Sequence, residues 1–473
     1  MQNISINDIT LFKDENNLIP MDDNMAILTH YYHLQGSRHG TAYKKKALDI
    51  VLQKHHETVI NNCVEPSAQY GFFQNEFDFP FPPVRKPKFT FIDLFAGIGG
   101  FRLAMQNLGG KCVYSSEIDE AAKRTYFINY GEVPFGDITL DSTKSYIPDN
   151  FDVLCAGFPC QAFSKAGKQA GLNDTRGTLF FEVQEILKTK RPKYLFLENV
   201  RNIVSHDHGN TWKIINENIR SLGYRIPKEP IILSPHQYGI PQFRERVYII
   251  GVFDPDHSSE DLCVPLGNLL GKDDNSIDTI LEENSVDSKF NISIQEKKVL
   301  TAWNEFYQGI NQKVIGYPVW SAYFKSSPSE LSKHPRWKQD FIQKNISLYK
   351  TNKSFIDKWL KKWNNLEDFT PTQKKFEWQA GISISSLWEG VIQLRPSGVR
   401  VKKPNFFPAL VAIVQIPIVG KRKRHLSIRE CARLQSFPDE FKPCTTDQLA
   451  LKQLGNSVNV NIIEKLAAQL ITI

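Results

Sequence analysis

The chain of 473 residues lacks long apolar runs, cysteine pairs at metal-binding spacing and an N-terminal targeting pattern. No segment approaches the roughly 20 apolar residues that a membrane-spanning helix needs, and the first residues lack the basic and then apolar pattern of a signal peptide. The seven cysteines are odd in number and include no Cys-x-x-Cys motif, which argues against a disulfide framework and a zinc site. We therefore expect a soluble, cytoplasmic protein that holds no metal.

The chain as a whole has only a small excess of basic over acidic residues, but one stretch is strongly basic. The net charge of +7 is ordinary for a protein of this length. Between residues 390 and 433, however, ten lysines and arginines accompany a single acid, Glu430. This stretch is either a solvated face or a surface that binds phosphates, and composition alone leaves both open.

The length of the chain and the change in sequence pattern along it predict more than one domain. Residues 1–88 form an extension with a helix expected at 42–60 and a proline-rich linker at 80–87, and they carry no recognisable chemistry. From residue 89 onward, short buried strands alternate with helices, the pattern of a Rossmann-like, doubly wound α/β domain with a parallel sheet. The expected strands are residues 89–95, 111–116, 151–156, 194–197 and 247–252.

The alternation stops near residue 253, and seven of the eight tryptophans follow between residues 303 and 388. Tryptophans at this density indicate a small separate core, although they can also stack on bases. Residues 454–473 again predict a helix, which could return to the first sheet. We expect an N-terminal extension at 1–88, an α/β domain at 89–254 completed by 454–473, and a smaller domain at 255–453.

A glycine-rich turn follows the first expected strand. Residues 93–100 read Asp-Leu-Phe-Ala-Gly-Ile-Gly-Gly, and such glycines let the backbone approach a ligand. The turn is not the complete G-x-G-x-x-G fingerprint of dinucleotide sites. Glu117 lies twenty residues beyond Gly97, where an acid can accept both ribose hydroxyls of a nucleoside. Together they favour an adenosine-type ligand over turn chemistry alone.

Two reactive side chains follow strands of the same sheet. Cys160 comes directly after Pro159 at the carboxyl end of its strand, where open α/β sheets place ligands. The alternative is an inert buried thiol, which is the commoner fate of a lone cysteine. Glu198 ends the next strand, and an acid carried out of an apolar run must be paired, protonated or functional. We expect the thiol and the carboxyl at one sheet edge.

A thiol, a carboxyl and an adenosine-type ligand can together methylate cytosine. Addition of the Cys160 thiolate to carbon 6 turns the ring into an enamine whose carbon 5 attacks an electrophilic methyl group. A proton-sharing Glu198, its pKa raised by apolar surroundings, would neutralise charge at ring nitrogen 3. Arg244 and Arg246 point the same way if their segment is extended, and Arg246 could then donate to the ring carbonyl.

In their order along the chain, the motifs resemble those of bacterial DNA cytosine-5 methyltransferases of restriction-modification systems. The resemblance covers roughly residues 89–253 and 396–473. Its segments are Phe-Ala-Gly-Ile-Gly-Gly at 95–100, Gly-Asp-Ile at 136–138, Gly-Phe-Pro-Cys-Gln at 157–161, Glu-Asn-Val at 198–200, Gln-x-Arg-x-Arg at 242–246, Arg-Glu-Cys-Ala-Arg-Leu-Gln at 429–435 and Gly-Asn-Ser-Val at 455–458. Each match is short, but together they are specific.

The resemblance implies a DNA (cytosine-5-)-methyltransferase whose target-recognition domain lies at 255–453. It implies S-adenosyl-L-methionine as the methyl donor and S-adenosyl-L-homocysteine as the product. The catalytic roles fall on Cys160, Glu198, Arg244 and Arg246. The residues that would surround the donor are Phe95, Gly97, Gly99, Glu117, Ile118, Asp137, Ile138, Asn456 and Val458, with Asp137 near the adenine amino group.

The same resemblance implies double-stranded DNA as the partner, and the target base must be swung out of the helix to be reached. Residues 161–177 are similar to the family's mobile loop, which closes over the target. The residues expected to contact DNA are Gln161, Ser164, Arg176, Arg395, Arg400, Lys402 and Lys403. We expect a monomer that acts on the bacterial nucleoid and pairs with a restriction endonuclease.

Rival functions remain at this point. A related branch of the family methylates transfer RNA, although an insertion of recognition-domain size favours DNA. A catalytically inactive DNA-binding regulator would not need the reactive residues, all of which are present. An amino-group methyltransferase would need an Asp/Asn/Ser-Pro-Pro-aromatic motif, which residues 81–84 match poorly. A nicotinamide oxidoreductase would leave Cys160 and Glu198 without a role.

Overall fold

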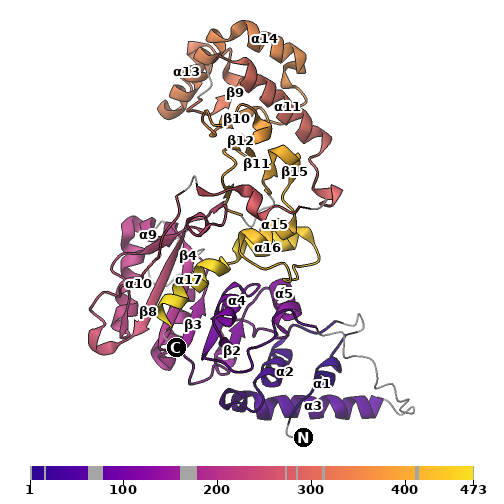
Figure 1. Ribbon diagram of the computed structural model, residues 1–473, viewed down its shortest axis with the longest axis vertical. Coiled ribbons are helices and arrows are strands. Elements are labelled where there is room, and N and C mark those ends of the chain that lie inside the picture. The colour runs from indigo at the N-terminus through magenta and orange to yellow at the C-terminus, as the bar shows by residue number, and fades with distance from the viewer. Residues whose placement is uncertain are drawn as a thin grey trace. The chain divides into compact units, whose positions relative to one another are not determined.

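The computed structural model divides into two compact units, each built on its own sheet (Figure 1). The described residues are 3–14, 18–61, 78–159, 178–271, 274–283, 286–311, 315–410 and 415–471. The first unit comprises Met1–Tyr238, Arg244–Leu269 and Gln435–Ile473, and the second comprises Gly239–Phe243 and Leu270–Leu434. Within the described ranges, no helix is long and apolar enough to cross a membrane.

Four parallel strands form the centre of the first unit. In chain order these are β1 (Phe89–Leu94), β2 (Gly110–Ser116), β3 (Val153–Ala156) and β4 (Tyr194–Val200). Their order in the sheet is β2-β1-β3-β4. The strands are buried almost throughout, as expected for parallel strands covered on both faces. The predicted Rossmann-like α/β fold is confirmed.

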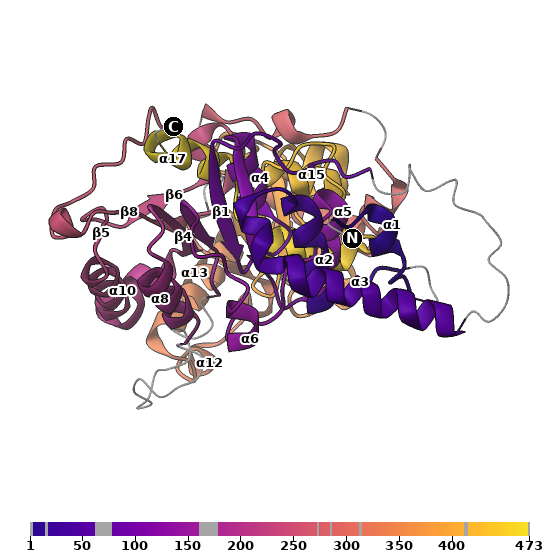
Figure 2. The ribbon, with the colours of Figure 1, turned by 90° about the horizontal axis from the view of Figure 1, so that it is seen from below.

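Helices cover both faces of this sheet (Figure 2). One face carries α4 (Gly100–Asn107) and α17 (Val460–Leu470), and the other carries α8 (Thr178–Lys190) and α10 (Asn210–Ser221). The unit also contains α1 (Ile6–Thr10), α5 (Glu120–Tyr130), α6 (Asp141–Lys144), α9 (Asn202–Ser205) and α16 (Asp447–Asn456). Glycines 99 and 131 have positive φ at the ends of α4 and α5, a conformation that suits glycine best.

The fifth predicted strand runs opposite to the parallel direction that we expected. β8 (Arg246–Phe253) pairs antiparallel with β4, and also with the short strands β5 (Tyr224–Arg225) and β6 (Ile231–Leu233). The chain leaves β6 and returns as β8 through residues 234–245, without the crossover helix that a parallel neighbour requires. A buried apolar run locates a strand but does not fix its direction.

The N-terminal residues share the core of this sheet. α2 (Asp23–Leu34) and α3 (Thr41–Asn61) bury apolar side chains, including Met25 and Val51, in one cluster with Ile92 of β1. The helix expected at 42–60 is confirmed as α3. Figure 2 shows α2 lying beside α3.

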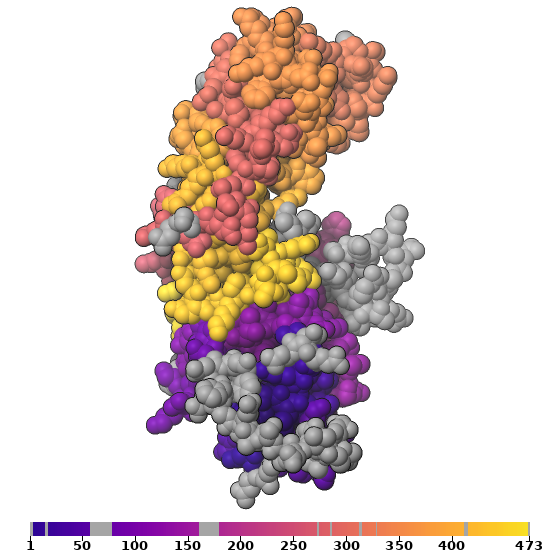
Figure 3. Space-filling model, turned by 90° about the vertical axis from the view of Figure 1, so that its right-hand side faces the viewer, coloured from indigo at the N-terminus to yellow at the C-terminus, as the bar shows by residue number. Residues whose placement is uncertain are grey.

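The C-terminal residues also return to the first unit, as expected. α17 packs against α4, and Asn107 donates to the carboxylate of Glu464. Figure 3 shows the C-terminal residues, in yellow, against purple residues of the sheet-bearing segment. The turn between α16 and α17 therefore lies near the end of β1, where α4 begins.

The second unit holds a six-stranded sheet in the order β15-β14-β11-β12-β10-β9. Its strands are β9 (Val319–Trp320), β10 (Lys375–Trp378), β11 (Val391–Arg395), β12 (Gly398–Lys402), β14 (Ile418–Val419) and β15 (Arg424–His425). A separate pair joins β7 (Gln242–Phe243) to β13 (Phe407–Pro408). The helices are α11 (Ile294–Gly309), α12 (Pro328–Leu331), α13 (Arg336–Thr351), α14 (Lys353–Lys362) and α15 (Ile428–Leu434).

Tryptophans form the core of the second unit. Trp303, Trp359 and Trp378 are buried in one apolar cluster, and Trp303 stacks on Phe376 with ring centres 5.0 Å apart. Trp337 is an exception, since its side chain is 62% exposed. The prediction of a separate core is confirmed for the buried members.

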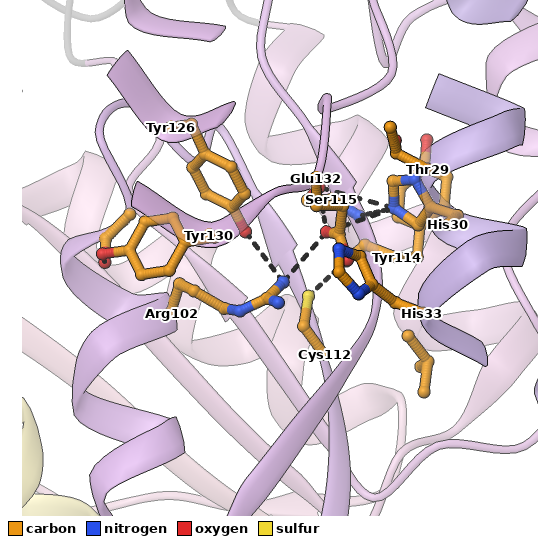
Figure 4. A network of polar contacts seen from close by, with 12 residues as sticks. Thr29, His30, His33, Arg102, Cys112, Tyr114, Ser115, Tyr126, Tyr130 and Glu132 are labelled. Carbon is orange, nitrogen blue, oxygen red and sulfur yellow. Dashed lines mark hydrogen bonds and ion pairs between the residues drawn. The ribbon is translucent and has the colours of Figure 1, made fainter. Parts of the chain in front are cut away.

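A buried ionic network joins the N-terminal helices to the sheet (Figure 4). Arg102 and Glu132 are fully buried, and the Arg102 Nη1 donates to Glu132 Oε1 at 2.9 Å. The Ser115 hydroxyl donates to the same oxygen at 2.8 Å, and His30 Nε2 lies 3.4 Å away. Burial raises the pKa of Glu132, but Arg102 and the neighbouring histidines outweigh it and lower this pKa to about 2. The carboxylate is therefore charged at neutral pH.

Acid should destabilise the first unit partly through His33, whose Nε2 lies 2.9 Å from the carbonyl oxygen of Gly131. Burial lowers the pKa of His33 from 6.5 to about 4. Between these values only the unfolded chain binds the proton, so stability is full above pH 6.5 and falls as the pH drops toward 4. His33→Gln keeps a donor for Gly131 and should reduce the loss between pH 7 and pH 5 by up to about 2 kcal/mol. Urea unfolding at both pH values measures this, and an equal loss in both proteins would contradict it.

Candidate active site

A pocket of about 390 Å³ lies at the carboxyl ends of the four parallel strands. Its walls are residues 95–98 and 100–101 after β1, 117–119 and 122 after β2, 157–159 after β3, 198–200 in β4, Arg244 and Arg246, 452–453 and 455–456 in α16, and 457–458 between α16 and α17. Open α/β sheets place their ligands at this edge. A larger cavity of about 830 Å³ in the same unit, bounded by residues 18–21, α5 and 442–449, contains none of the predicted site residues that the structure describes.

Most of the residues predicted to surround the donor line this pocket. Those lining it are Phe95, Gly97, Glu117, Ile118, Asn456 and Val458. Gly99, Asp137 and Ile138 do not line it. At Gly99 a Cβ would collide with the ring of Tyr130, so this glycine is explained by packing of the turn.

Glu117 ties the glycine turn to the end of β2. Its Oε2 accepts from Gly97 N and its Oε1 from Asp119 N, both at 2.8 Å. Burial raises the pKa of this carboxyl, and the backbone donors oppose the rise. Gly97 has positive φ and no atom within 4 Å of the position that a Cβ would occupy. The turn therefore leaves open space beside a fixed acid.

Glu198 and Arg246 meet at the other end of the pocket. Because β8 is antiparallel to β4, Arg246 at its start lies opposite Val200 at the end of β4. Arg246 Nε lies 3.1 Å from Glu198 Oε1, and the carboxyl is nearly buried. Burial raises the pKa of Glu198, although Arg246 and Arg244 both act to lower it. This carboxyl therefore takes up a proton more readily than an exposed one.

Arg244 lies in the pocket wall but is engaged by the backbone. It is almost fully buried, and its Nη2 donates to the carbonyl of Ser457 at 3.0 Å. Its own N–H donates to the hydroxyl of Ser234 at 2.8 Å. Burial lowers the pKa of Arg244, and Arg246 lowers it further. The guanidinium thus links the segment before β8 to the turn at Ser457, which directly follows Asn456 at the end of α16.

Sequence reasoning missed two positioning contacts. Asn199 Nδ2 donates to the carbonyl of Phe158 at 3.0 Å and so holds the residues directly before Cys160. Its place in the Glu-Asn-Val motif was a usable signal. Lys452 Nζ donates to Asp119 at 2.8 Å, and no local pattern pointed to this pair because the partners are far apart in sequence.

Four predicted residues lie outside the described residues: Cys160, Gln161, Ser164 and Arg176. The chain is described up to Pro159, which lines the pocket. In the described part of the chain, His, Cys, Asp and Glu side chains do not gather in the groups of three or more that a metal site requires.

The predicted DNA-contacting residues of the second unit differ in their surroundings. Arg395 lies opposite Gly398 at the turn between β11 and β12. Arg400 Nε lies 2.6 Å from Glu377 Oε2, in a largely buried ion pair. Lys402 Nζ lies 5.8 Å from the centre of the Phe406 ring, and Lys403 is exposed.

Several basic side chains in the stretch at 390–433 bind groups within the second unit. Arg424 forms a buried, two-pronged pair with Glu430, at 2.6 and 2.7 Å. Arg422 and Arg433 donate to the backbone carbonyls of Glu282 and Ile280. A count of basic residues therefore overstates the charge that this stretch can offer to phosphates.

Comparison with known proteins shows that most of the chain matches a known family. A family model described as C-5 cytosine-specific DNA methylase matches residues 89–472. The chain is 39% identical to the Type II methyltransferase M.HpaII of Haemophilus parainfluenzae, over 85% of this chain and 94% of that protein. It is 31% identical to M.AluI of Cellulosimicrobium cellulans (80% and 90% covered) and 33% identical to M.HhaI of Haemophilus parahaemolyticus (80% and 92% covered), both Type II methyltransferases.

Arg244→Met should loosen the turn between α16 and α17. The carbonyl of Ser457 would lose a buried donor, which should lower the free energy of unfolding by about 1–3 kcal/mol. Hydrogen exchange of residues 455–460 should become faster. Arg246→Met is the matched control, because its guanidinium contacts Glu198 instead. Unchanged exchange at 455–460 in Arg244→Met would show that this contact does not hold the turn.

Proposed function

The chain belongs to the family of C-5 cytosine-specific DNA methylases, and we propose that Cys160, Glu198 and Arg246 perform its chemistry on one cytosine. As a member of this family it is a DNA (cytosine-5-)-methyltransferase that uses S-adenosyl-L-methionine. The observation that supports this proposal is a shared pocket. Pro159, which precedes Cys160, lines the same pocket as Glu198 and Glu117.

The residues at the β1 and β2 end of the pocket suit the methyl donor. When bound, S-adenosyl-L-methionine supplies an electrophilic methyl group. Glu117 would accept from the ribose hydroxyls, and the open space at Gly97 leaves room for the nucleoside. Among the wall residues that the structure describes, Lys452 is the one lysine, and its pairing with Asp119 fits a donor without phosphates. Phe95, Ile118, Asn456 and Val458 would enclose it.

Asp137 and Ile138 are proposed for the adenine end of the donor. They follow the loop whose Phe135 carbonyl accepts from Glu117 N at 2.9 Å. This bond keeps the loop beside the acid that would hold the ribose. Asp137 would accept from the adenine amino group.

Cys160 is the proposed nucleophile. Its thiolate would form a bond to carbon 6 of the cytosine. Carbon 5 would then take the methyl group, whose bond to the donor sulfur breaks and leaves S-adenosyl-L-homocysteine. Loss of the carbon 5 proton and cleavage of the bond between sulfur and carbon 6 restore the aromatic ring and the thiolate. Asn199 positions this step by holding the carbonyl of Phe158, two residues before Cys160.

Glu198 and Arg246 are proposed to hold the other side of the ring. A proton on Glu198 would neutralise charge at ring nitrogen 3, and its burial favours that protonated form. Arg246, 3.1 Å from Glu198, would donate to the ring carbonyl. Arg244 would act through residues 455–458, because its guanidinium donates to the carbonyl of Ser457.

Duplex DNA is the proposed substrate, and the second unit is proposed to select its sequence. Gln161, Ser164, Arg176, Arg395, Arg400, Lys402 and Lys403 are the proposed DNA contacts, with Arg400 needing to leave Glu377 to reach a base. We also propose a monomer that protects bacterial DNA and pairs with an endonuclease. Relatives named Type II methyltransferases support methyl transfer to DNA. Methylation-sensitive sequencing of DNA from expressing cells tests this, because it reveals the modified base and its context.

Cys160→Ala should abolish methyl transfer to mixed duplex DNA while leaving S-adenosyl-L-homocysteine affinity within about twofold, since the thiol acts only on the base. Duplexes containing 5-fluorocytosine should trap the wild-type protein covalently but not the variant. Full activity in Cys160→Ala would overturn the assignment. Transfer of methyl groups to transfer RNA but not to DNA would overturn the choice of substrate.

Glu198→Gln should lower kcat about a hundredfold or more, because the amide cannot share a proton with the ring. Burial raises the pKa of Glu198, so in the wild type the active, protonated form persists to higher pH than for an exposed carboxyl and is lost as the pH rises through the shifted value. The high-pH fall in kcat should therefore disappear in Glu198→Gln. An identical pH profile in both proteins would assign that fall to another group.

A further inference from the structure

N-terminal helices cover the outer edge of β2. Among the described residues, β2 has β1 on one side and only a single bridge, Ser116 to Phe135, on the other. Such an edge leaves backbone groups in need of partners. His30 Nε2 accepts from Ser115 N at 3.2 Å, and the Tyr43 hydroxyl donates to the Val113 carbonyl at 2.8 Å. Side chains of α2 and α3 thus take the place of a neighbouring strand.

α2 also holds the loop at 131–136, which contains no regular strand or helix. Three side chains of one helix contact its backbone in succession. These are His33 at the Gly131 carbonyl (2.9 Å), Thr29 at the Val133 N–H (3.0 Å) and Asp23 at the Gly136 N–H (2.9 Å). The path of the loop is therefore set by a segment that lies outside the residues matched by the family model.

The loop leads directly to the adenine end of the proposed donor site. Phe135 N donates to the Ser115 carbonyl and Glu117 N donates to the Phe135 carbonyl, both at 2.9 Å. The N–H that Asp23 accepts belongs to Gly136, the residue directly before Asp137. One helix thus supports both the strand end that leads to Glu117 and the loop that leads to Asp137.

We propose that α2 is a positioning element of the donor site, and that Asp23 fixes the backbone that presents Asp137 to the adenine amino group. The inference rests on the proposed role of Asp137. A charge-assisted bond that a carboxylate accepts is stronger than one between neutral groups. Asp23 also packs closely against the loop, since a Cβ on Gly136 would lie 3.3 Å from Asp23 Oδ1. Holding Asp137 in place before binding lowers the ordering cost that the donor must otherwise meet.

The test measures S-adenosyl-L-homocysteine binding to the full-length protein by calorimetry. Asp23→Ala should weaken binding about three- to tenfold, the equivalent of one hydrogen bond. Asp23→Asn keeps an acceptor oxygen for Gly136 and should restore most of the affinity. Affinity for duplex DNA, measured separately, should not change in either variant.

Asp22→Ala, at the N-cap of the same helix, is the matched control. Asp22 caps α2 by accepting from Met25 N at 2.8 Å and does not contact the loop. Its loss should lower the melting temperature but leave S-adenosyl-L-homocysteine affinity unchanged. Equal loss of affinity in Asp22→Ala and Asp23→Ala would reduce α2 to general support of the fold and overturn the proposal.

S-inosylhomocysteine, which carries a carbonyl in place of the adenine amino group, separates this inference from the function on which it rests. It should bind Asp23→Ala and the wild type equally, because the contact in question is absent. Asp137→Ala tests the proposed function itself, and no loss of S-adenosyl-L-homocysteine affinity in that variant would remove the role of Asp137. A loss in Asp137→Ala without one in Asp23→Ala would overturn only the role of Asp23.

Discussion

The candidate site depends on one constraint, the shared carboxyl edge of four buried parallel strands. Strands covered on both faces have little room for polar side chains, so polar groups gather where the strands end. Glu117 follows β2, and Glu198 lies near the end of β4. Asp93 is an exception inside β1, where full burial raises its pKa well above the ordinary value and favours the neutral form. The chemistry is thus placed by strand register more than by loop length.

The reversed direction of β8 completes this edge. A strand parallel to β4 would bring its last residues, near Phe253, beside Glu198 and would carry Arg246 to the opposite edge. Because β8 is antiparallel, its first residue reaches Glu198 instead. Sequence reasoning expected both a parallel strand and an Arg246 near this acid, and these expectations exclude each other. The structure shows the antiparallel strand, and Arg246 lies 3.1 Å from Glu198 as a result.

What the sequence could predict depended on local signals. The glycine turn at 95–100, the helix α3 and the tryptophan core follow from residue type and short-range periodicity. The features that the sequence did not predict depend on contacts between residues that are far apart in the chain. Arg400 was expected at DNA, and Glu377 pairs with it across neighbouring strands. Likewise, Lys452 forms an ion pair with Asp119. Within residues 390–433, Arg424 is paired with Glu430.

The boundary at residue 89 marks where motifs begin, but packing does not stop there. The family model starts at this residue, yet Met25, Leu28 and Val51 lie in the same apolar cluster as the sheet. A segment can lack readable chemistry and still fix the backbone of a site, because backbone N–H groups and carbonyls carry no sequence signature. Gly136 illustrates this, since its N–H is held by Asp23, more than a hundred residues earlier in the chain. Where such a segment satisfies an exposed strand edge, removing it would expose the edge as well as free the loop.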